Sequence, residues 1–153
     1  MEEHEIRQLY GRKVKSKLVI DGYRIGLIES ENDEILELNV EIDIFNEGDI
    51  SEDNYKVNVI LENLPQEIHI SWDKGKADFT FLPRDKIKIS TILIIPIFPG
   101  EKITALRFSL ELPKKQNVKL DGVKTKVHLF YSNEDQEMEI QKLFKNIPGI
   151  NEN

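Results

Sequence analysis

The sequence predicts an all-β domain, an antiparallel β-sandwich of seven to nine strands, and three observations lead to this prediction. Apolar and polar residues alternate with a period of two along most of the chain, which is the period of a half-buried strand. Glycine, proline, asparagine and aspartate separate the alternating stretches at regular spacing. Alanine, the best helix former, occurs only twice in 153 residues, at Ala77 and Ala105, while the strand formers Ile, Val and Phe are abundant.

The first part of the chain contains the clearest strand. In the stretch 35–45, Leu38, Val40 and Ile42 fall on one face and acidic or amide side chains on the other, whereas a helix would scatter the apolar set around its circumference. Before it, the stretches 14–20 and 23–28 read as two shorter strands. Asp21 and Gly22 lie between them, as in a type I′ hairpin turn.

The same alternation continues to the end of the domain. It predicts strands within 55–62, 67–72, 77–81, 87–95, 106–112 and 125–131. Residues 133–145 fit either a helix or the last strand of a hairpin, and we favour the strand because 125–131 needs a partner. The predicted core consists of Leu38, Val40, Ile42, Val57, Val59, Ile70, Phe79, Ile89, Phe108, Leu110, Val127 and Leu129.

The length suits one domain. We expect an N-terminal segment over 1–12 that can form a short helix, the sandwich over 13–145, and a flexible tail over 146–153. The N-terminus lacks the basic start and apolar run of a secretory signal, and no apolar stretch is long enough to span a membrane, so the sequence favours a cytoplasmic protein.

The composition argues against several classes of function. The net charge of −7 opposes nonspecific binding to nucleic acid, and the absence of cysteine excludes disulfides, thiolate zinc sites and a cysteine nucleophile. No phosphate-binding glycine loop or serine nucleophile elbow occurs. His69 and His128 lie on the polar parity of their strands, without metal-ligand spacing. We therefore expect no enzyme activity, no cofactor and no metal site.

An acidic run is the most uneven feature of the charge pattern. Residues 29–53 contain eleven acids and no lysine or arginine. We interpret the run as a solvated acidic face, paired with lysines on neighbouring strands. Its two loops leave calcium binding open as an alternative, since calcium takes oxygen ligands.

The alternation fails between Ser90 and Phe98, where both faces of the predicted strand are apolar. Something must cover the second face, and three covers are open: the N-terminal segment, with Ile6, Leu9 and Tyr10 at helical spacing, a partner chain, or a neighbouring domain outside this sequence. We favour the N-terminal segment. The possible interface consists of Ile92, Ile94, Ile97 and Phe98. Trp72 can likewise be interpreted in two ways, as a side chain anchored in the core or as an exposed platform for a ligand. We favour the core position.

Several turns carry a resemblance to known modules. Leu38–Ile42 is followed by the turn Phe45-Asn46-Glu47-Gly48, then by Tyr55–Val59, Leu64-Pro65 and Pro99-Gly100-Glu101. The span 35–131 resembles bacterial and archaeal immunoglobulin-like modules of the cell-adhesion-related type. It also resembles the C-terminal β-sandwich of Schlafen-like bacterial ATP-binding proteins. The resemblance implies an immunoglobulin-like sandwich with an accessory, recognition or spacing role, and it supplies no catalytic residues.

These observations lead to one functional expectation and one alternative. The expected function is a non-enzymatic interaction or accessory module that mediates protein–protein contacts within a larger protein or assembly. Its partner would be another protein or a further copy of the chain, not nucleic acid or a membrane. The alternative is a carbohydrate- or calcium-binding β-sandwich module.

Overall fold

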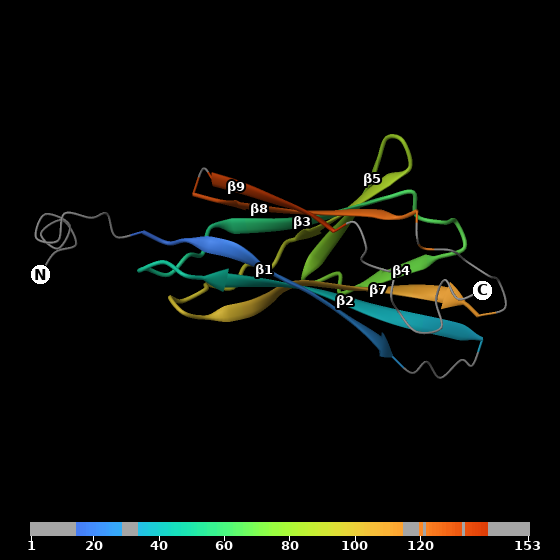
Figure 1. Cartoon of the computed structure of the whole chain (residues 1–153), viewed down its shortest axis with the longest axis horizontal. Helices are drawn as coiled ribbons and strands as arrows, with labels where there is room; N and C mark the ends of the chain where they lie inside the picture. Colours follow the sequence, from blue (N-terminus) through green and yellow to red (C-terminus); the bar gives the residue numbers. More distant parts are fainter. Residues whose placement is uncertain (1–14, 29–33, 115–119, 121, 133, 141–153) are drawn as a thin grey trace, which may run out of the picture.

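The computed structural model shows two antiparallel sheets, which confirms the predicted β-sandwich (Figure 1). It describes residues 15–28, 34–114, 120, 122–132 and 134–140. In this part of the chain, no helix is long and apolar enough to cross a lipid bilayer. The strands are β1 (Leu18–Ile28), β2 (Ile35–Asn46), β3 (Tyr55–Glu62), β4 (His69–Trp72), β5 (Ala77–Leu82), β6 (Lys86–Thr91), β7 (Lys102–Pro113), β8 (Lys124–Tyr131) and β9 (Glu134–Ile140).

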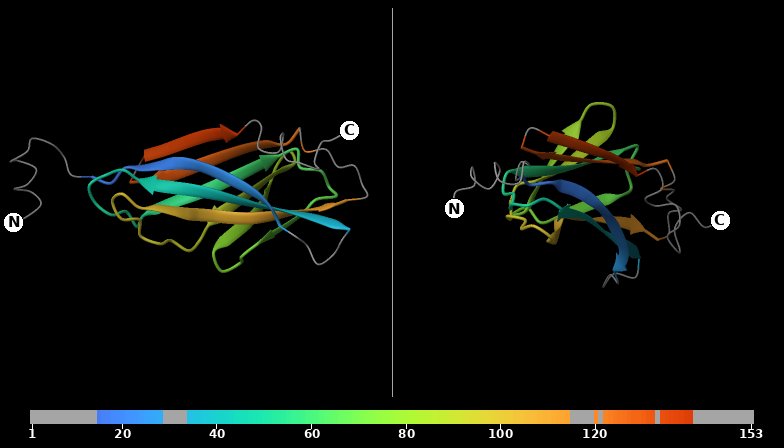
Figure 2. Two further views of the ribbon diagram at one scale, coloured as in Figure 1. Left: turned by 60° about the horizontal axis from the view of Figure 1, so that its bottom comes forward. Right: turned by 60° about the vertical axis from the view of Figure 1, so that its left-hand side comes forward.

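The order of the strands is immunoglobulin-like, as predicted. The four-stranded sheet has the order β1-β2-β7-β4, and the five-stranded sheet has the order β5-β6-β3-β8-β9. With β7 and β4 in the places of strands E and D, these orders reproduce the ABED and CFG sheets of an immunoglobulin domain. The β5–β6 hairpin extends the second sheet, and β4 precedes it in the chain. Figure 2 shows β1, β2 and β7 side by side in one layer.

The core lies between the inner faces of the two sheets. Ten of the twelve predicted core residues are at most 1% exposed, while Ile70 and Phe79 are half-buried. Val40 faces Phe108 across β2 and β7, and Val59 is flanked by Ile89 and Val127 across its two neighbouring strands. Side chains of one parity therefore meet on the buried face, as the period of two requires.

One predicted turn is wrong. Asp21 and Gly22 do not form a hairpin, because β1 runs without interruption through them and pairs with β2 along its length. The register shifts between Ile20 and Gly22, and Gly22 has a φ of 144°. A β-bulge, like a tight turn, often needs a residue that can adopt a positive φ. A dipeptide with glycine, such as Asp21-Gly22, is therefore compatible with either structure.

The predicted strand over 87–95 is also shorter than expected. β6 ends at Thr91, and the amides of Ile92 and Leu93 both donate to the carbonyl of Lys76, at 3.0 and 3.3 Å. Pro96 has no amide to donate to a strand neighbour. The doubly apolar stretch is therefore a loop that crosses between the sheets.

At the C-terminal end, the hairpin interpretation is correct. β9 pairs with β8 from Tyr131–Glu134 to Thr125–Ile140. The expectations for 1–12, including its cover over the loop 92–98, and for the tail 146–153 lie outside the described residues.

Candidate binding groove

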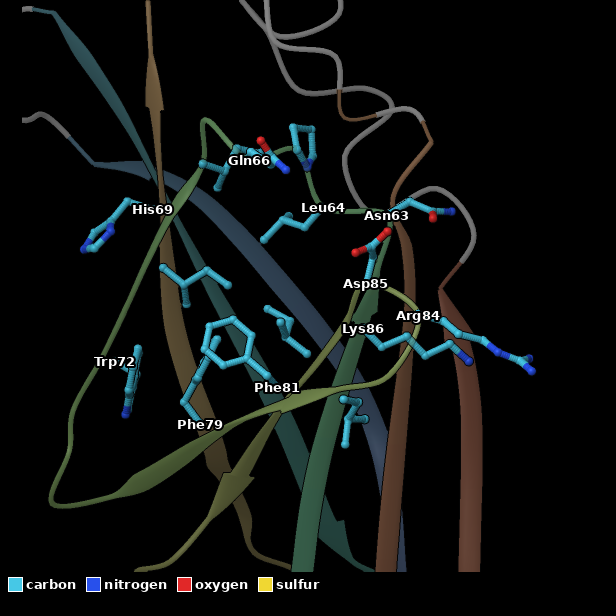
Figure 3. A pocket seen from close by; sticks show the side chains of 15 residues that line it. Asn63, Leu64, Gln66, His69, Trp72, Phe79, Phe81, Arg84, Asp85 and Lys86 are labelled. Carbon is cyan, nitrogen blue, oxygen red and sulfur yellow. The ribbon is translucent and has the colours of Figure 1, made fainter.

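A groove of about 880 Å³ lies on one side of the sandwich, between β4 and β5 (Figure 3). These two strands are the free edges of the two sheets. The groove is apolar at its base and polar along its rim. The base includes Leu64, Ile68, Ile70, Trp72, Phe79 and Phe81, and the rim includes Gln66, His69, Arg84, Asp85 and Lys86.

Three aromatic rings form a continuous row in the groove. The rings of Trp72 and Phe79 are stacked, with centroids 4.8 Å apart and planes at 16°. Phe81 meets Phe79 edge to face at 4.9 Å. Both arrangements are favourable for aromatic pairs. The row therefore extends from the half-buried Trp72 on β4 to the open end of β5.

Exposure rises steadily along the inward face of β5. Ala77 is 3% exposed, Phe79 is half-buried, and Phe81 is 80% exposed. All three have the same parity, so the difference arises from what lies opposite them. The four-stranded sheet ends at β4, and no further strand of the described chain covers Phe81. The groove is thus the place where the four-stranded sheet has no strand opposite the end of β5.

A short turn holds the two edges together. The Asp73 carboxylate accepts a hydrogen bond from the Gly75 amide at 2.9 Å, and its carbonyl accepts from the amides of Lys76 and Ala77. An aspartate whose side chain accepts a hydrogen bond from the amide two residues further on is typical of tight turns. This turn connects β4 in one sheet to β5 in the other and so places Trp72 beside Phe79.

The rim carries charges that have no ion-pair partner. Among the described residues, Arg84 and Lys86 form no salt bridge, and their side chains extend away from the aromatic rings (Figure 3). The segment 63–90 contains five basic and four acidic residues, in a chain with a net charge of −7. The groove region is therefore less acidic than the rest of the protein.

On the opposite side of the sandwich, one side chain bridges the two sheets near the start of β1. There, β1 and β9 are the two edges, and the Gln136 side chain on β9 donates to the carbonyl of Leu18 and accepts from the amide of Ile20. This side-chain bridge satisfies edge groups of β1 that would otherwise be free to pair. The open edges at β4 and β5 thus differ from those at β1 and β9.

The predicted interface residues lie on another part of the surface. Ile92 and Phe98 are 53% and 58% exposed, and Ile94 is half-buried. Ile97 is fully buried, because its backbone forms a bridge with Glu52 that carries the side chain into the core. Ile92 and Ile94 line a second hollow of about 660 Å³ together with Phe130. Of the four predicted interface residues, Ile92, Ile94 and Phe98 are therefore at least partly accessible at the surface, and Ile97 is not.

Two acids of the run 29–53 are not solvated, which corrects that part of the prediction. Asp43 is 5% exposed and accepts hydrogen bonds from Arg24 at 2.9 and 3.0 Å and from Thr104 at 2.9 Å. Glu52 is 7% exposed and accepts from Ser16 at 2.9 Å and from Ser132. Both acids fix loops and strand edges, so their roles are structural.

The same contacts shift the pKa values of both acids downward. The hydrogen bond from Arg24 holds the pKa of Asp43 below its usual value, against the effect of burial. Burial alone would raise the pKa of Glu52, but hydrogen bonds from Ser132, Ser16 and nearby backbone amides outweigh it and lower the pKa. Each carboxylate therefore stabilises the fold in its charged form.

We expect the free energy of unfolding to decrease as the pH falls below about 4. A lowered folded-state pKa means that the unfolded chain binds protons first, so this stabilisation is lost as the pH falls through the folded pKa. Urea unfolding at pH 7 and pH 3 measures the loss. Asp43→Asn is expected to reduce the pH dependence, whereas Glu67→Gln at an exposed position is not, and equal effects would contradict the assignment.

The structure describes few groups suited to chemistry. In the described residues, no three histidine or acidic side chains converge as a metal site would need. His69 is exposed, and His128 lies 3.2 Å from Glu137 on the neighbouring strand. The pairing of His128 and Lys126 with Glu137 is the cross-strand charge pairing expected of a sheet surface.

The comparisons with known proteins give no family. No family model and no curated protein matches the sequence. Similar solved structures include a GH20 exo-β-N-acetylglucosaminidase from Vibrio harveyi, with 10% identity and a TM-score of 0.38 over 76% of this chain and 17% of that chain. AvmM, which catalyses macrocyclization in alchivemycin A biosynthesis, has 12% identity and a TM-score of 0.35 over 78% of this chain and 88% of its own.

A third similar structure is the T6 backbone pilin of serotype M6 Streptococcus pyogenes, with 14% identity and a TM-score of 0.30 over 77% of this chain and 30% of that chain. The chain thus spans about a sixth of the glycosidase and less than a third of the pilin. The fold and the groove define a β-sandwich that is open between the edge strands β4 and β5, where aromatic side chains are exposed.

Proposed function

We propose that this chain is a non-enzymatic interaction module that binds a protein partner in the groove between β4 and β5. The observation that carries the proposal is Phe81, a large apolar side chain that is 80% exposed at the end of an aromatic row. An exposed phenylalanine in a hollow gains about 1.5–3 kcal/mol when a partner buries it. Aromatic anchors of this kind dominate the energy of protein interfaces.

The free edges support the same function. Exposed edge strands present unpaired amides and carbonyls, which an added strand can satisfy. The apolar base and the polar rim of the groove reproduce the usual anatomy of an interface, in which an apolar centre is surrounded by polar groups. The resemblance to immunoglobulin-like accessory modules is consistent with such a role within a larger protein or assembly.

Carbohydrate binding is the second candidate, because stacked aromatic rings beside amide and charged side chains can also hold a sugar. One face of the Trp72 ring is covered by Phe79, however, and Trp72 is half-buried, so only part of the ring is open to a sugar. A shift of the melting temperature with oligosaccharides would favour this candidate. Calcium binding would be shown by a shift with calcium alone.

A photo-crosslinking amino acid at position 81 tests the proposal. We expect it to form defined crosslinks to a polypeptide in lysate of the cells that make the protein, because Phe81 lines the groove and is 80% exposed. Excess wild-type chain should abolish the crosslinks, while excess Phe81→Asp chain should not.

The matched control is the same photo-crosslinking group at Thr80, which is exposed on the outer face of the same strand. This position should give no defined product. Equal labelling from both positions, or none from position 81, would exclude the groove as a protein-binding surface.

A further inference from the structure

The two free edges at the groove belong to different sheets and run in opposite directions. β4 is the last strand of the four-stranded sheet, and β5 is the last strand of the five-stranded sheet. The short turn between Trp72 and Ala77 reverses the chain as it passes from one sheet to the other. A strand with the direction of β5 would therefore pair antiparallel with β4 if it lay in the same sheet.

We propose that the partner in the groove is a second copy of this chain, an inference that rests on the proposed function. The two-fold axis of this dimer runs parallel to the strands and lies at the groove, midway between the two sheets. Rotation about it brings the four-stranded sheet of one copy into the same layer as the five-stranded sheet of the other. It places β5 of each copy beside β4 of the other, in antiparallel orientation. Each four-stranded sheet then continues into the five-stranded sheet of the other copy, and both free edges are paired.

The side chains of the two edges suit this pairing. Ile70 and Trp72 on β4 face the groove, as Phe79 and Phe81 on β5 do, so apolar side chains would meet on the inner face. On the outer face, the exposed His69 and Ser71 of one copy would lie beside Asp78 and Thr80 of the other. The side chains of His69 and Ser71 can donate hydrogen bonds to the Asp78 carboxylate. Inward-facing residues of one strand lie beside inward-facing residues of the other, and outward-facing residues beside outward-facing ones.

The symmetry also explains the exposed phenylalanine. Rotation about an axis parallel to the strands keeps each residue at its height along the strand, so Phe81 of one copy faces Phe81 of the other. Opposed sheets lie about 10 Å apart, a distance that aromatic side chains from both layers fill. The strand missing above Phe81 would be β5 of the second copy.

A simpler pairing of β4 with β4 does not fit. It would join the two four-stranded sheets edge to edge and leave β5 of both copies competing for the same space in the other layer. The layer exchange avoids this overlap, because each β5 fills the position that the other copy leaves open. The difference in strand number between the two sheets therefore favours the exchanged dimer.

Light scattering on the purified full chain tests the proposal. We expect the wild-type chain to have twice the mass of one copy and the Phe81→Asp chain to dissociate. The dissociation constant should rise by about 100-fold or more, since two phenylalanine side chains leave the interface. Phe98→Asp, at an apolar residue that is also exposed but lies outside the groove, should leave the dimer intact.

A crosslinking experiment locates the interface independently. The chain has no cysteine, so Phe81→Cys introduces the only thiol. At a protein concentration well above the raised dissociation constant, a short bismaleimide should join two copies of the Phe81→Cys chain and leave the Phe98→Cys chain single. Unchanged circular dichroism of each variant would show that the monomer still folds, as expected for positions that are already exposed.

A wild-type chain that stays monomeric at millimolar concentration would overturn the second-copy proposal, as would a dimer that Phe98→Asp rather than Phe81→Asp dissociates. The proposed function has a separate test in the photo-crosslink from position 81. A product that contains a different polypeptide, with a monomeric wild-type chain, would retain protein binding in the groove and exclude the second copy as its occupant.

Discussion

Asn46→Ala is expected to lower the free energy of unfolding by about 3 kcal/mol or more, because buried backbone groups lose their partners. Asn46 ends β2 and is fully buried. Its side-chain amide donates to the carbonyls of Ile50 and Ile97, both at 2.9 Å, and its side-chain oxygen accepts from the amides of Gly48 at 2.9 Å and Lys17 at 3.3 Å.

These hydrogen bonds join three segments that are far apart in the sequence. The residue before β1, the end of β2 with the loop that follows it, and the Ile97 bridge all meet at this one side chain. Alanine has no polar atom to replace any of the bonds, and buried polar groups without partners are costly. The cluster therefore acts as a structural centre at this end of the sandwich.

Thermal and urea unfolding measure the effect, and a decrease in melting temperature of about 6–12 °C corresponds to the expected loss. Asn39→Ala on the same strand is the matched control, since Asn39 makes one side-chain hydrogen bond, to Glu41 at 2.9 Å. It should cost less than about 1 kcal/mol. Similar losses in the two variants would contradict the role assigned to Asn46.

The alternation over 35–45 predicted β2 and its buried face because the side-chain period of a strand is fixed by its geometry. Leu38, Val40 and Ile42 are fully buried, as that period requires. Nothing in the alternation distinguishes a bulge from a hairpin, since both use a permissive residue. For this reason the sequence predicts a turn at Gly22, although β1 continues through it.

The groove could not be predicted in the same way. Phe79 and Phe81 have the same residue type and the same parity, yet Phe79 is half-buried and Phe81 is 80% exposed. Their difference depends on which strand of the other sheet lies opposite, and that depends on the pairing order of all nine strands. Period and turn chemistry describe single strands and their neighbours in sequence, so they do not reveal an unequal number of strands in the two sheets.

The apolar stretch after Ser90 shows a related limit. Ile92 and Ile94 suggested a strand covered on both faces, whereas the chain leaves the sheet after Thr91. The contacts that redirect it come from residues distant in sequence. The carbonyl of Lys76 accepts the amide of Ile92, and the hydroxyl of Tyr55 donates to the carbonyl of Ile95 at 2.6 Å.

Gly48→Ala is expected to lower the free energy of unfolding by about 2–4 kcal/mol, because the added methyl group has no space. A Cβ atom at this position would lie 2.4 Å from the amide nitrogen of Lys17, 2.5 Å from the carbonyl oxygen of Lys15 and 2.7 Å from the carbonyl carbon of Ser16. All three are backbone atoms, so no side-chain rotation relieves the overlap.

Relief of this overlap requires the segment before β1 to move away from the loop after β2. That movement would break the hydrogen bonds from the Glu47 amide to the Lys17 carbonyl at 2.9 Å and from the Asp49 amide to the Lys15 carbonyl at 2.8 Å. Amide hydrogen exchange at Glu47 and Asp49 should therefore accelerate in Gly48→Ala, in addition to the loss measured by urea unfolding.

Gly26→Ala provides the control, because a Cβ atom at Gly26 would meet no heavy atom within 4 Å. Alanine also restricts the unfolded chain more than glycine does, so this variant should be neutral or more stable by up to about 1 kcal/mol. If Gly48→Ala were as stable as Gly26→Ala, the segment before β1 would not be held against the loop. The centre at Asn46 would then lack the close backbone approach that allows its side chain to reach Lys17.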